Sequence, residues 1–310
     1  MKSVTVLLST YNGEKYLHTQ LNSLSNQTIK FNLIIRDDGS KDNTINIIKS
    51  WKNKLKFKLI KGENIGVINS FFELLKYNDI DSDYIAFCDQ DDIWDSNKLE
   101  EGIKSIELNS KTNIPNLYHS NLKLINEDGI FLNKYFWKSM NITPIKSHKI
   151  NRLLCQPIVT GCTCIINKSL YLKFLSHPTP KNVKMHDWWL SLIACCFGKI
   201  ISDERSFIEY RLHQSNVIGA EIDILKKIFK NLKNIKKYIS SYKKEVKERI
   251  FQAQDFKNIY ADEIDTLTLK TLNKYITCVD SNFFIKKIIQ FKYKFYQQGL
   301  LRNIISFFLF

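Results

Sequence analysis

Three carboxylates stand close together at the end of an apolar run in the first third of the chain. The run, residues 84–88, has the length of a buried strand, and Asp89, Asp91 and Asp92 follow it within four positions. Carboxylates this close repel one another, so at neutral pH a cation or a raised pKa must relieve them. A hard divalent ion such as Mg²⁺ takes one or two protein carboxylates together with phosphate oxygens. The cluster therefore predicts a metal site for a phosphate-bearing ligand, with a solvated acidic turn or a helix cap as the alternative.

The elements that must position this cluster alternate between strand and helix. Runs of strand character at residues 3–9, 31–35, 57–60 and 84–88 are separated by segments with apolar residues at helical spacing. Such alternation predicts a mostly parallel, doubly wound α/β sheet flanked by helices, which binds ligands outside the carboxyl ends of its strands. Three of these strands end in polar residues that we expect to meet in one crevice: Ser9-Thr10, Asp37-Asp38 and Asp89 to Asp92. Neither GxGxxG nor GxxxxGK[ST] occurs, which excludes the usual dinucleotide and P-loop sites.

Composition favours a folded protein whose positive charge is concentrated toward the carboxyl terminus. Of 310 residues, 44% are apolar, which is enough for a substantial core. The formal charge is +15, and residues 222–310, with 18 basic and 8 acidic side chains, carry +10 of it. No run of about 18 apolar residues occurs, so no transmembrane helix is predicted. The seven cysteines lack zinc-site spacing, which favours reduced thiols in a reducing compartment.

Beyond residue 221 the chain predicts basic amphipathic helices. One apolar stripe at helical spacing consists of Leu225, Ile228, Phe229, Leu232, Ile235 and Ile239, with lysines on the remaining positions. Residues 283–310 alternate apolar pairs with further basic side chains. Such helices either lie on an anionic membrane surface, which we favour, or pack on the catalytic domain. We expect a catalytic domain at residues 1–220 and a helical C-terminal region at 221–310.

Taken in order, the motifs resemble the nucleotide-sugar half of family 2 glycosyltransferases of the GT-A fold. The resemblance covers roughly residues 3–220 and is closest to bacterial polysaccharide rhamnosyltransferases. The motifs that carry it are Ser9 to Gly13, Asp37 to Ser40, Asn64 to Gly66, Asp89 to Asp92, Gly161-Cys162, His186 to Trp189, and Tyr210 to His213. It implies a nucleoside diphosphate sugar as donor and a glycan or lipid-linked oligosaccharide as acceptor.

The resemblance also implies roles for single residues. Those expected to contact the nucleotide sugar are Ser9, Tyr11, Asp38, Asn64, Asp89 and Arg211, the last as a bidentate donor to the diphosphate. Those expected to hold Mg²⁺ or Mn²⁺ are Asp91 and His213. The alternatives are turn capping for Ser9 and Asp38, a helix entry for Asn64, and a surface loop for His213.

Asp187 is the candidate general base. It precedes Trp188 and Trp189 at an expected helix start, where the helix dipole keeps a carboxylate ionised and apolar walls limit competing water. The alternative is a helix cap, a role that Asp fills well. His186 has no chemical role of its own here and is expected to pack or to support its neighbours.

These features predict an inverting, metal-dependent glycosyltransferase of bacterial surface polysaccharide synthesis, such as capsule or O-antigen, with dTDP-rhamnose as the favoured donor. A UDP-hexose transferase of the same fold is the alternative, and a nucleotidyltransferase lacks its usual Gly-rich loop here. From another class, a basic nucleic-acid-binding protein is disfavoured, because the charge lies in amphipathic helices and the expected cleft is acidic. We expect a cytoplasmic protein, peripheral on the inner face of the plasma membrane, without a nucleic-acid partner.

Overall fold

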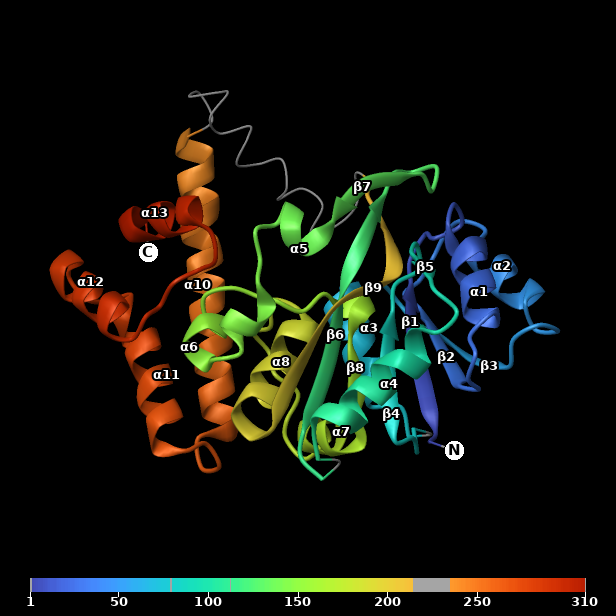
Figure 1. Cartoon of the computed structure of the whole chain (residues 1–310), viewed down its shortest axis with the longest axis horizontal. Coiled ribbons are helices and arrows are strands. Elements are labelled where there is room, and N and C mark those ends of the chain that lie inside the picture. Colours follow the sequence, from blue (N-terminus) through green and yellow to red (C-terminus); the bar gives the residue numbers. More distant parts are fainter. Residues whose placement is uncertain (1, 79, 112, 214–234, 310) are drawn as a thin grey trace. The chain divides into compact units, whose positions relative to one another are not determined.

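The structure is a computed structural model that describes residues 2–78, 80–111, 113–213 and 235–309 (Figure 1). The chain forms two compact units. The first consists of Met1–Phe136, Val159–His177 and Met185–Arg211, and the second of Trp137–Ile158, Pro178–Lys184 and Leu212–Phe310. The predicted boundary between residues 220 and 221 lies outside the described residues.

The first half of the first unit is the predicted parallel sheet. Its strands are β1 (Val4–Thr10), β2 (Asn32–Asp37), β3 (Phe57–Lys61) and β4 (Tyr84–Cys88), and its helices are α1 (Leu17–Ser25), α2 (Thr44–Ser50) and α3 (Gly66–Leu75). The strands pair in parallel in the order β3-β2-β1-β4. The continuous apolar runs of β1 and β4 are buried throughout, as expected for strands that are covered on both faces.

The other half of the sheet is mixed. It contains β5 (Ile93–Trp94), β6 (Asn116–Ile125), β7 (Phe131–Tyr135), β8 (Ile165–Asn167) and β9 (Lys199–Arg211), together with the helices α4 (Lys98–Asn109), α7 (Lys168–Leu175) and α8 (His186–Phe197). Strand β8 is antiparallel to both β4 and β6, whereas β6 and β9 are parallel. Helix α3 packs on β1 and β2, and α4 and α8 pack on β6 and β9. The predicted α/β fold is confirmed, with its parallel part confined mainly to the first four strands.

The second unit is helical. Its long helices are α10 (Ile235–Tyr260), α11 (Thr266–Cys278), α12 (Phe283–Lys292) and α13 (Leu300–Leu309), and shorter turns are α5 (Phe136–Ser139), η1 (Pro144–Ser147) and α6 (Ile150–Leu153) (Figure 1). The first four residues of the predicted stripe, Leu225 to Leu232, lie outside the described residues. Of the helices that the structure describes, none is both long enough and apolar enough to cross a membrane.

Candidate active site

The carboxyl ends of three neighbouring strands bring polar side chains to one edge of the sheet. In the parallel register, Thr10 of β1 lies opposite Asp37 of β2, and Leu8 lies opposite Cys88 of β4. Asp38 and Asp89 directly follow these strands. They therefore flank the end of β1, at the edge where α/β sheets bind ligands.

Asp38 is buried at this edge and holds the start of α3. Its Oδ1 accepts a hydrogen bond from the backbone N–H of Ile65 at 3.0 Å and pairs with Arg36, while Oδ2 accepts from the N–H of Gly66 at 2.9 Å. Gly66 has a φ of +80°, a conformation that favours glycine and lets the chain turn these N–H groups toward the carboxylate. These contacts give Asp38 a structural role, and its contact with the nucleoside stays a prediction.

Ser9 and Asn64 lie around the same helix start. The Ser9 hydroxyl shares a hydrogen bond of 2.6 Å with the hydroxyl of Ser70 on α3. The Asn64 side-chain oxygen accepts from the Gly66 N–H at 3.2 Å, as a helix-entry residue would. Both side chains are thus oriented by α3, on the side of β1 that carries Asp38.

Tyr11 is fixed by a residue that the sequence analysis did not single out. The side chain of Gln90 accepts from the Tyr11 N–H at 2.9 Å and donates to the Tyr11 carbonyl at 3.1 Å. A Cβ at Gly13 would lie 2.3 Å from the Gln90 Oε1, so a larger residue at this position would displace the Gln90 side chain. The pair ties the loop after β1 to the acidic segment after β4 and leaves the Tyr11 ring exposed.

The acidic segment converges with Cys162, which comes from the short turn η2 (Gly161–Thr163). Ligand atoms of Asp89, Asp92 and Cys162 lie within 4.8 Å of one another, and among the described residues this group could hold a metal ion. Asp92 is fully buried; its Oδ1 accepts from the Arg211 N–H at 3.3 Å, and its Oδ2 has no hydrogen-bond partner. Helix α4 begins only at Lys98, so Asp92 is not the helix cap that the sequence analysis offered as an alternative.

Burial and mutual repulsion disturb the titration of this group. Burial, together with the charges of Asp91 and Asp187, raises the pKa of Asp89 to about 7. Burial, together with the charges of Asp91 and Asp89, raises the pKa of Asp92 well above its ordinary value, although a hydrogen bond with the Cys162 thiol opposes the shift. Burial also raises the pKa of that thiol, which keeps it protonated. A bound cation would relieve this repulsion, so the two carboxylates fit a divalent ion.

Arg211, at the end of β9, is engaged by backbone oxygens. Its Nε donates to the carbonyl of Asp91 at 3.0 Å, and its Nη1 donates to the carbonyls of Asn126 at 3.3 Å and Glu127 at 2.9 Å. These bonds hold the acidic segment against the turn between β6 and β7. His213 follows two positions later and belongs to the second unit, so its pairing with Asp91 stays a prediction.

Asp187 lies one position inside α8 and is buried. The N-cap of α8 is Met185, so the capping alternative for Asp187 does not describe its position. Its carboxylate accepts from the N–H of Trp188 at 2.6 Å and from the N–H of Gly161. Burial raises the pKa of Asp187 to about 7, despite these two bonds, which favour the charged form. A carboxyl that titrates near neutrality can serve as a general base.

His186 packs in an apolar pocket beside this carboxylate. Its ring lies 4.1 Å from that of Phe71 and 5.3 Å from that of Phe87, and neither ring nitrogen has a hydrogen-bond partner. Burial lowers the pKa of His186 to about 3, so the imidazole is neutral at working pH. A Cβ at Gly161 would come within 2.9 Å of its Nε2, which explains the glycine at this turn. The packing role expected for His186 matches this environment.

Lys98 is a second residue near this site that the sequence analysis missed, and it is ionisable. It is buried at the first position of α4, its Nζ lies 3.2 Å from the centre of the Trp94 ring, and it has no hydrogen-bond acceptor. Burial lowers the pKa of Lys98 to about 8, against the attraction of neighbouring cysteines and Asp92. Its helical spacing with the buried Gly102 and Ile106 was the available signal, since a charge on an apolar helix face is unusual.

Comparison with known sequences identifies the family. Residues 5–172 match the model of glycosyl transferase family 2, which is more than half of the chain. The dTDP-rhamnosyl transferase RfbG of Shigella flexneri is 28% identical over 227 residues, covering 69% of this chain and 74% of that protein. The UDP-Glc:alpha-D-GlcNAc-diphosphoundecaprenol beta-1,3-glucosyltransferase WfgD of Escherichia coli is 29% identical over 228 residues, covering 72% and 83% respectively.

Solved structures support the fold. TarS of S. aureus in complex with UDP-GlcNAc aligns with a TM-score of 0.58 at 17% identity, over 94% of this chain and 73% of that one. The mannosyltransferase PcManGT from Pyrobaculum calidifontis, in complex with GDP-Man and Mn²⁺, aligns with a TM-score of 0.52 at 13% identity, over 99% and 87%. Sequence and fold agree: the chain belongs to glycosyl transferase family 2 and has the GT-A fold.

Proposed function

We propose that this chain is an inverting transferase that moves a sugar from a nucleoside diphosphate sugar to a hydroxyl of a glycan or lipid-linked acceptor in bacterial surface polysaccharide synthesis. The observation that carries the proposal is the buried carboxyl of Asp187, whose pKa of about 7 suits a base. Its charge raises the pKa of Asp89, so the base stands next to the acidic cluster. A proton acceptor beside a cation site is what a single displacement on a sugar diphosphate requires.

In the proposed reaction the carboxylate of Asp187 takes the proton of the acceptor hydroxyl. The acceptor oxygen attacks the anomeric carbon on the face opposite the diphosphate, and a new glycosidic bond forms. The bond from the anomeric carbon to the phosphate oxygen breaks, and its electron pair leaves with the nucleoside diphosphate. Because there is one displacement, the anomeric configuration inverts. The buried indoles of Trp188 and Trp189 help to exclude water from the base.

The carboxylates of Asp92 and Asp89 would hold a divalent cation, although the family resemblance assigned Asp89 to the nucleotide sugar. Their oxygens converge, Oδ2 of Asp92 has no protein partner, and hard oxygen donors suit Mg²⁺ or Mn²⁺. Family resemblance adds Asp91 and His213 as ligands, whereas the neutral Cys162 thiol is a poor one. When bound, such a cation would neutralise the negative charge that develops on the leaving diphosphate. The nucleotide sugar itself would contact Ser9, Tyr11, Asp38, Asn64 and Arg211.

Two donor classes have support. The rhamnosyl transferase RfbG is among the relatives, which favours dTDP-rhamnose. UDP-hexoses are the second candidate, because WfgD is named for UDP-Glc and the TarS structure contains UDP-GlcNAc. The name of WfgD also gives a diphosphoundecaprenol acceptor, which favours a lipid-linked acceptor here and action at the inner face of the plasma membrane.

Thermal melting of the full chain with a panel of nucleotide sugars tests this function. We expect dTDP-rhamnose, or otherwise one UDP-hexose, to raise the melting temperature only when Mg²⁺ or Mn²⁺ is present, since a ligand at 100 times its Kd stabilises by about 2.7 kcal/mol. The stabilising donor should then be hydrolysed slowly or transferred. If no nucleotide sugar stabilises the protein or is consumed with either metal, the proposal is wrong.

A further inference from the structure

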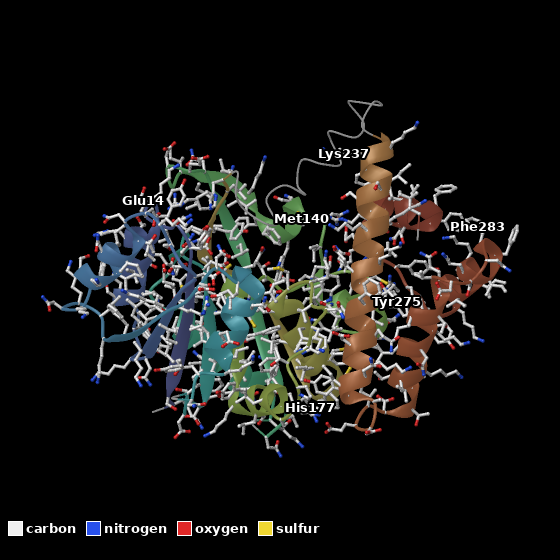
Figure 2. The ribbon with its side chains drawn as sticks, turned by 180° about the vertical axis from the view of Figure 1, so that it is seen from behind. Glu14, Met140, His177, Lys237, Tyr275 and Phe283 are labelled. Carbon is white, nitrogen blue, oxygen red and sulfur yellow. The ribbon has the colours of Figure 1, made fainter. Side chains whose placement is uncertain are left out.

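The second unit buries apolar residues of α10 and α11, the two longest of its described helices. In α10, Tyr242, Ala253 and Phe256 are buried, and in α11 the same holds for Leu272 and Tyr275. Figure 2 shows Tyr275 between α10 and α11. These described parts of the C-terminal region therefore use their apolar residues to build a core. The basic amphipathic pattern of α10 alone does not imply a membrane-facing surface.

Helices α12 and α13 have the opposite arrangement. Of the residues of α12, only the polar Gln290 is buried, and it donates to the hydroxyl of the buried Ser306 on α13 at 3.2 Å. Phe284 and Phe291 of α12 are 78% and 77% exposed, and Phe308 of α13 is 68% exposed. A polar contact thus joins the two helices on the inside while large apolar side chains face outward.

The exposed residues form stripes at helical spacing. On α12 the stripe is Phe284, Ile288 and Phe291, and on α13 it is Leu300, Ile304, Phe307 and Phe308. The rings of Phe283 and Phe307 lie 6.2 Å apart and connect the helices, and Figure 2 shows Phe283 at the outer margin of this unit. A groove of about 300 Å³ lined by Ile304, Phe307 and Phe308, among others, lies in the same surface. We call this area the α12–α13 surface.

Its charge is uniformly positive. Residues 281–310 contain four lysines, one arginine and no acidic residue. Lys287 reaches over the rings of Phe283 and Phe307, at 5.3 and 4.9 Å, so the positive charge lies within the apolar surface itself. Two copies of this surface would repel each other. An anionic partner that also accepts apolar side chains complements it.

We propose that the α12–α13 surface binds an anionic lipid bilayer, with Phe284, Phe291 and Phe308 entering the interface and the basic residues contacting lipid phosphates. Each helix has 10 residues and is about 15 Å long, too short to cross a hydrocarbon core of about 30 Å. The helices would therefore lie in the plane of the interface, as amphipathic anchors do. The inference is independent of the donor chemistry, although it suits a lipid-linked acceptor.

Tryptophan substitution reports insertion directly. In the full chain, the emission of the added tryptophan in Phe284→Trp is obtained by subtracting the wild-type spectrum. This emission should shift to the blue with vesicles of 70% phosphatidylcholine and 30% phosphatidylglycerol, and brominated lipid should quench it. Leu108→Trp, at a position of the first unit that is 75% exposed, is the matched control and should show neither effect. An unshifted and unquenched Phe284→Trp signal would contradict insertion.

Vesicle flotation measures the affinity. The affinity for vesicles should fall about tenfold or more per residue in the triple variant Phe284→Ser/Phe291→Ser/Phe308→Ser. It should fall about fivefold per charge in the double variant Lys286→Gln/Lys292→Gln, and high salt should mask this second loss. Melting curves should stay near wild type, because all five side chains are outside the core.

Wild-type protein that does not float, or Ser variants that bind like wild type, would overturn the proposal. So would a dimer in light scattering that the Ser substitutions dissociate, since the surface would then join two copies. Melting shifts induced by the nucleotide sugar are measured in parallel. Protein that is stabilised by the donor but does not float contradicts only this inference, and protein that floats but is not stabilised contradicts only the proposed function.

Discussion

The active-site edge of the first unit and the α12–α13 surface of the second depart from the usual distribution of side chains in opposite directions. The first buries ionisable groups, namely Asp92, Lys98 and Asp187, at one edge of its sheet, whereas the second exposes Phe284 and Phe291 on α12. Buried charge costs free energy, and apolar side chains left outside forgo the gain of burial. Neither arrangement helps the chain to fold. The two proposals account for this difference, since a charged ligand would bind at the first unit and an anionic lipid bilayer at the second.

The largest expected effect comes from the buried base. Asp187→Asn should lower kcat by about 10²–10⁴-fold, the usual contribution of a positioned base, while donor affinity stays near wild type. Asn has the same size and keeps an oxygen for the Trp188 N–H, so the fold should persist. Steady-state kinetics with donor-binding measurements check this. Preserved turnover would refute the assignment and turn attention to Asp92 or His186.

A second prediction compares the metal dependence of variants at different acidic side chains. Asp92→Asn should raise the Mn²⁺ concentration for half-maximal activity by about 10–100-fold, because it removes a converging oxygen ligand. Asp91→Asn and His213→Ala test the ligands that family resemblance implies. Asp95→Asn is the control, since Asp95 forms a partly exposed ion pair with Lys123 instead. A wild-type rate in EDTA would remove the metal from the mechanism.

The titration of Asp187 predicts both a rate profile and a stability profile. Because only the ionised carboxyl accepts a proton, kcat should fall about tenfold per pH unit below about 7. The folded pKa is raised, so the native state holds an extra proton between about pH 4 and 7 and stability falls as pH rises through this range. Asp187→Asn should therefore melt above wild type at pH 8, without metal, and lose this advantage by pH 4. A constant difference across pH would contradict the raised pKa.

The smallest effect on activity should come from substitution of Lys98, which we expect to change the free energy of unfolding instead. Its folded pKa is lowered, so its burial cost is present in full below about pH 8 and disappears as pH rises toward 10.5. Lys98→Met should raise the free energy of unfolding by roughly 2–3 kcal/mol at pH 7 and by progressively less above pH 8. Chemical denaturation across pH measures this. A loss of stability of similar size would show that attraction to Asp92 outweighs burial.

The parts of the fold and of the site that could be predicted from the sequence follow from local patterns. Apolar runs ending in polar residues predicted β1, β2 and β4 and the edge where Asp38 and Asp89 lie, because a parallel sheet fixes which strand ends meet. Family motifs marked Asp187. Residues that meet across long sequence separations were not predictable. Cys162 joins Asp89 and Asp92 through the short turn η2, which lies just before β8 and far from the acidic segment in sequence.

The second unit was harder to predict for the same reason. Its core includes Trp137–Ile158, far from the C-terminal helices in sequence, and Arg249 of α10 donates to the carbonyl of Cys155 there. Periodicity shows that a helix has an apolar face but not which partner covers it. The stripes of α10 and α12 look alike in sequence, yet one is buried and the other is exposed.

The most direct test of the central claim is the anomeric configuration of the first-formed product, followed by NMR during turnover with the donor that the melting screen selects. A single displacement assisted by Asp187 predicts a product whose new glycosidic bond has the configuration opposite to that of the donor, from the first turnover onward. A product that retains the donor configuration would contradict the mechanism, because it requires two displacements or attack from the face of the leaving group.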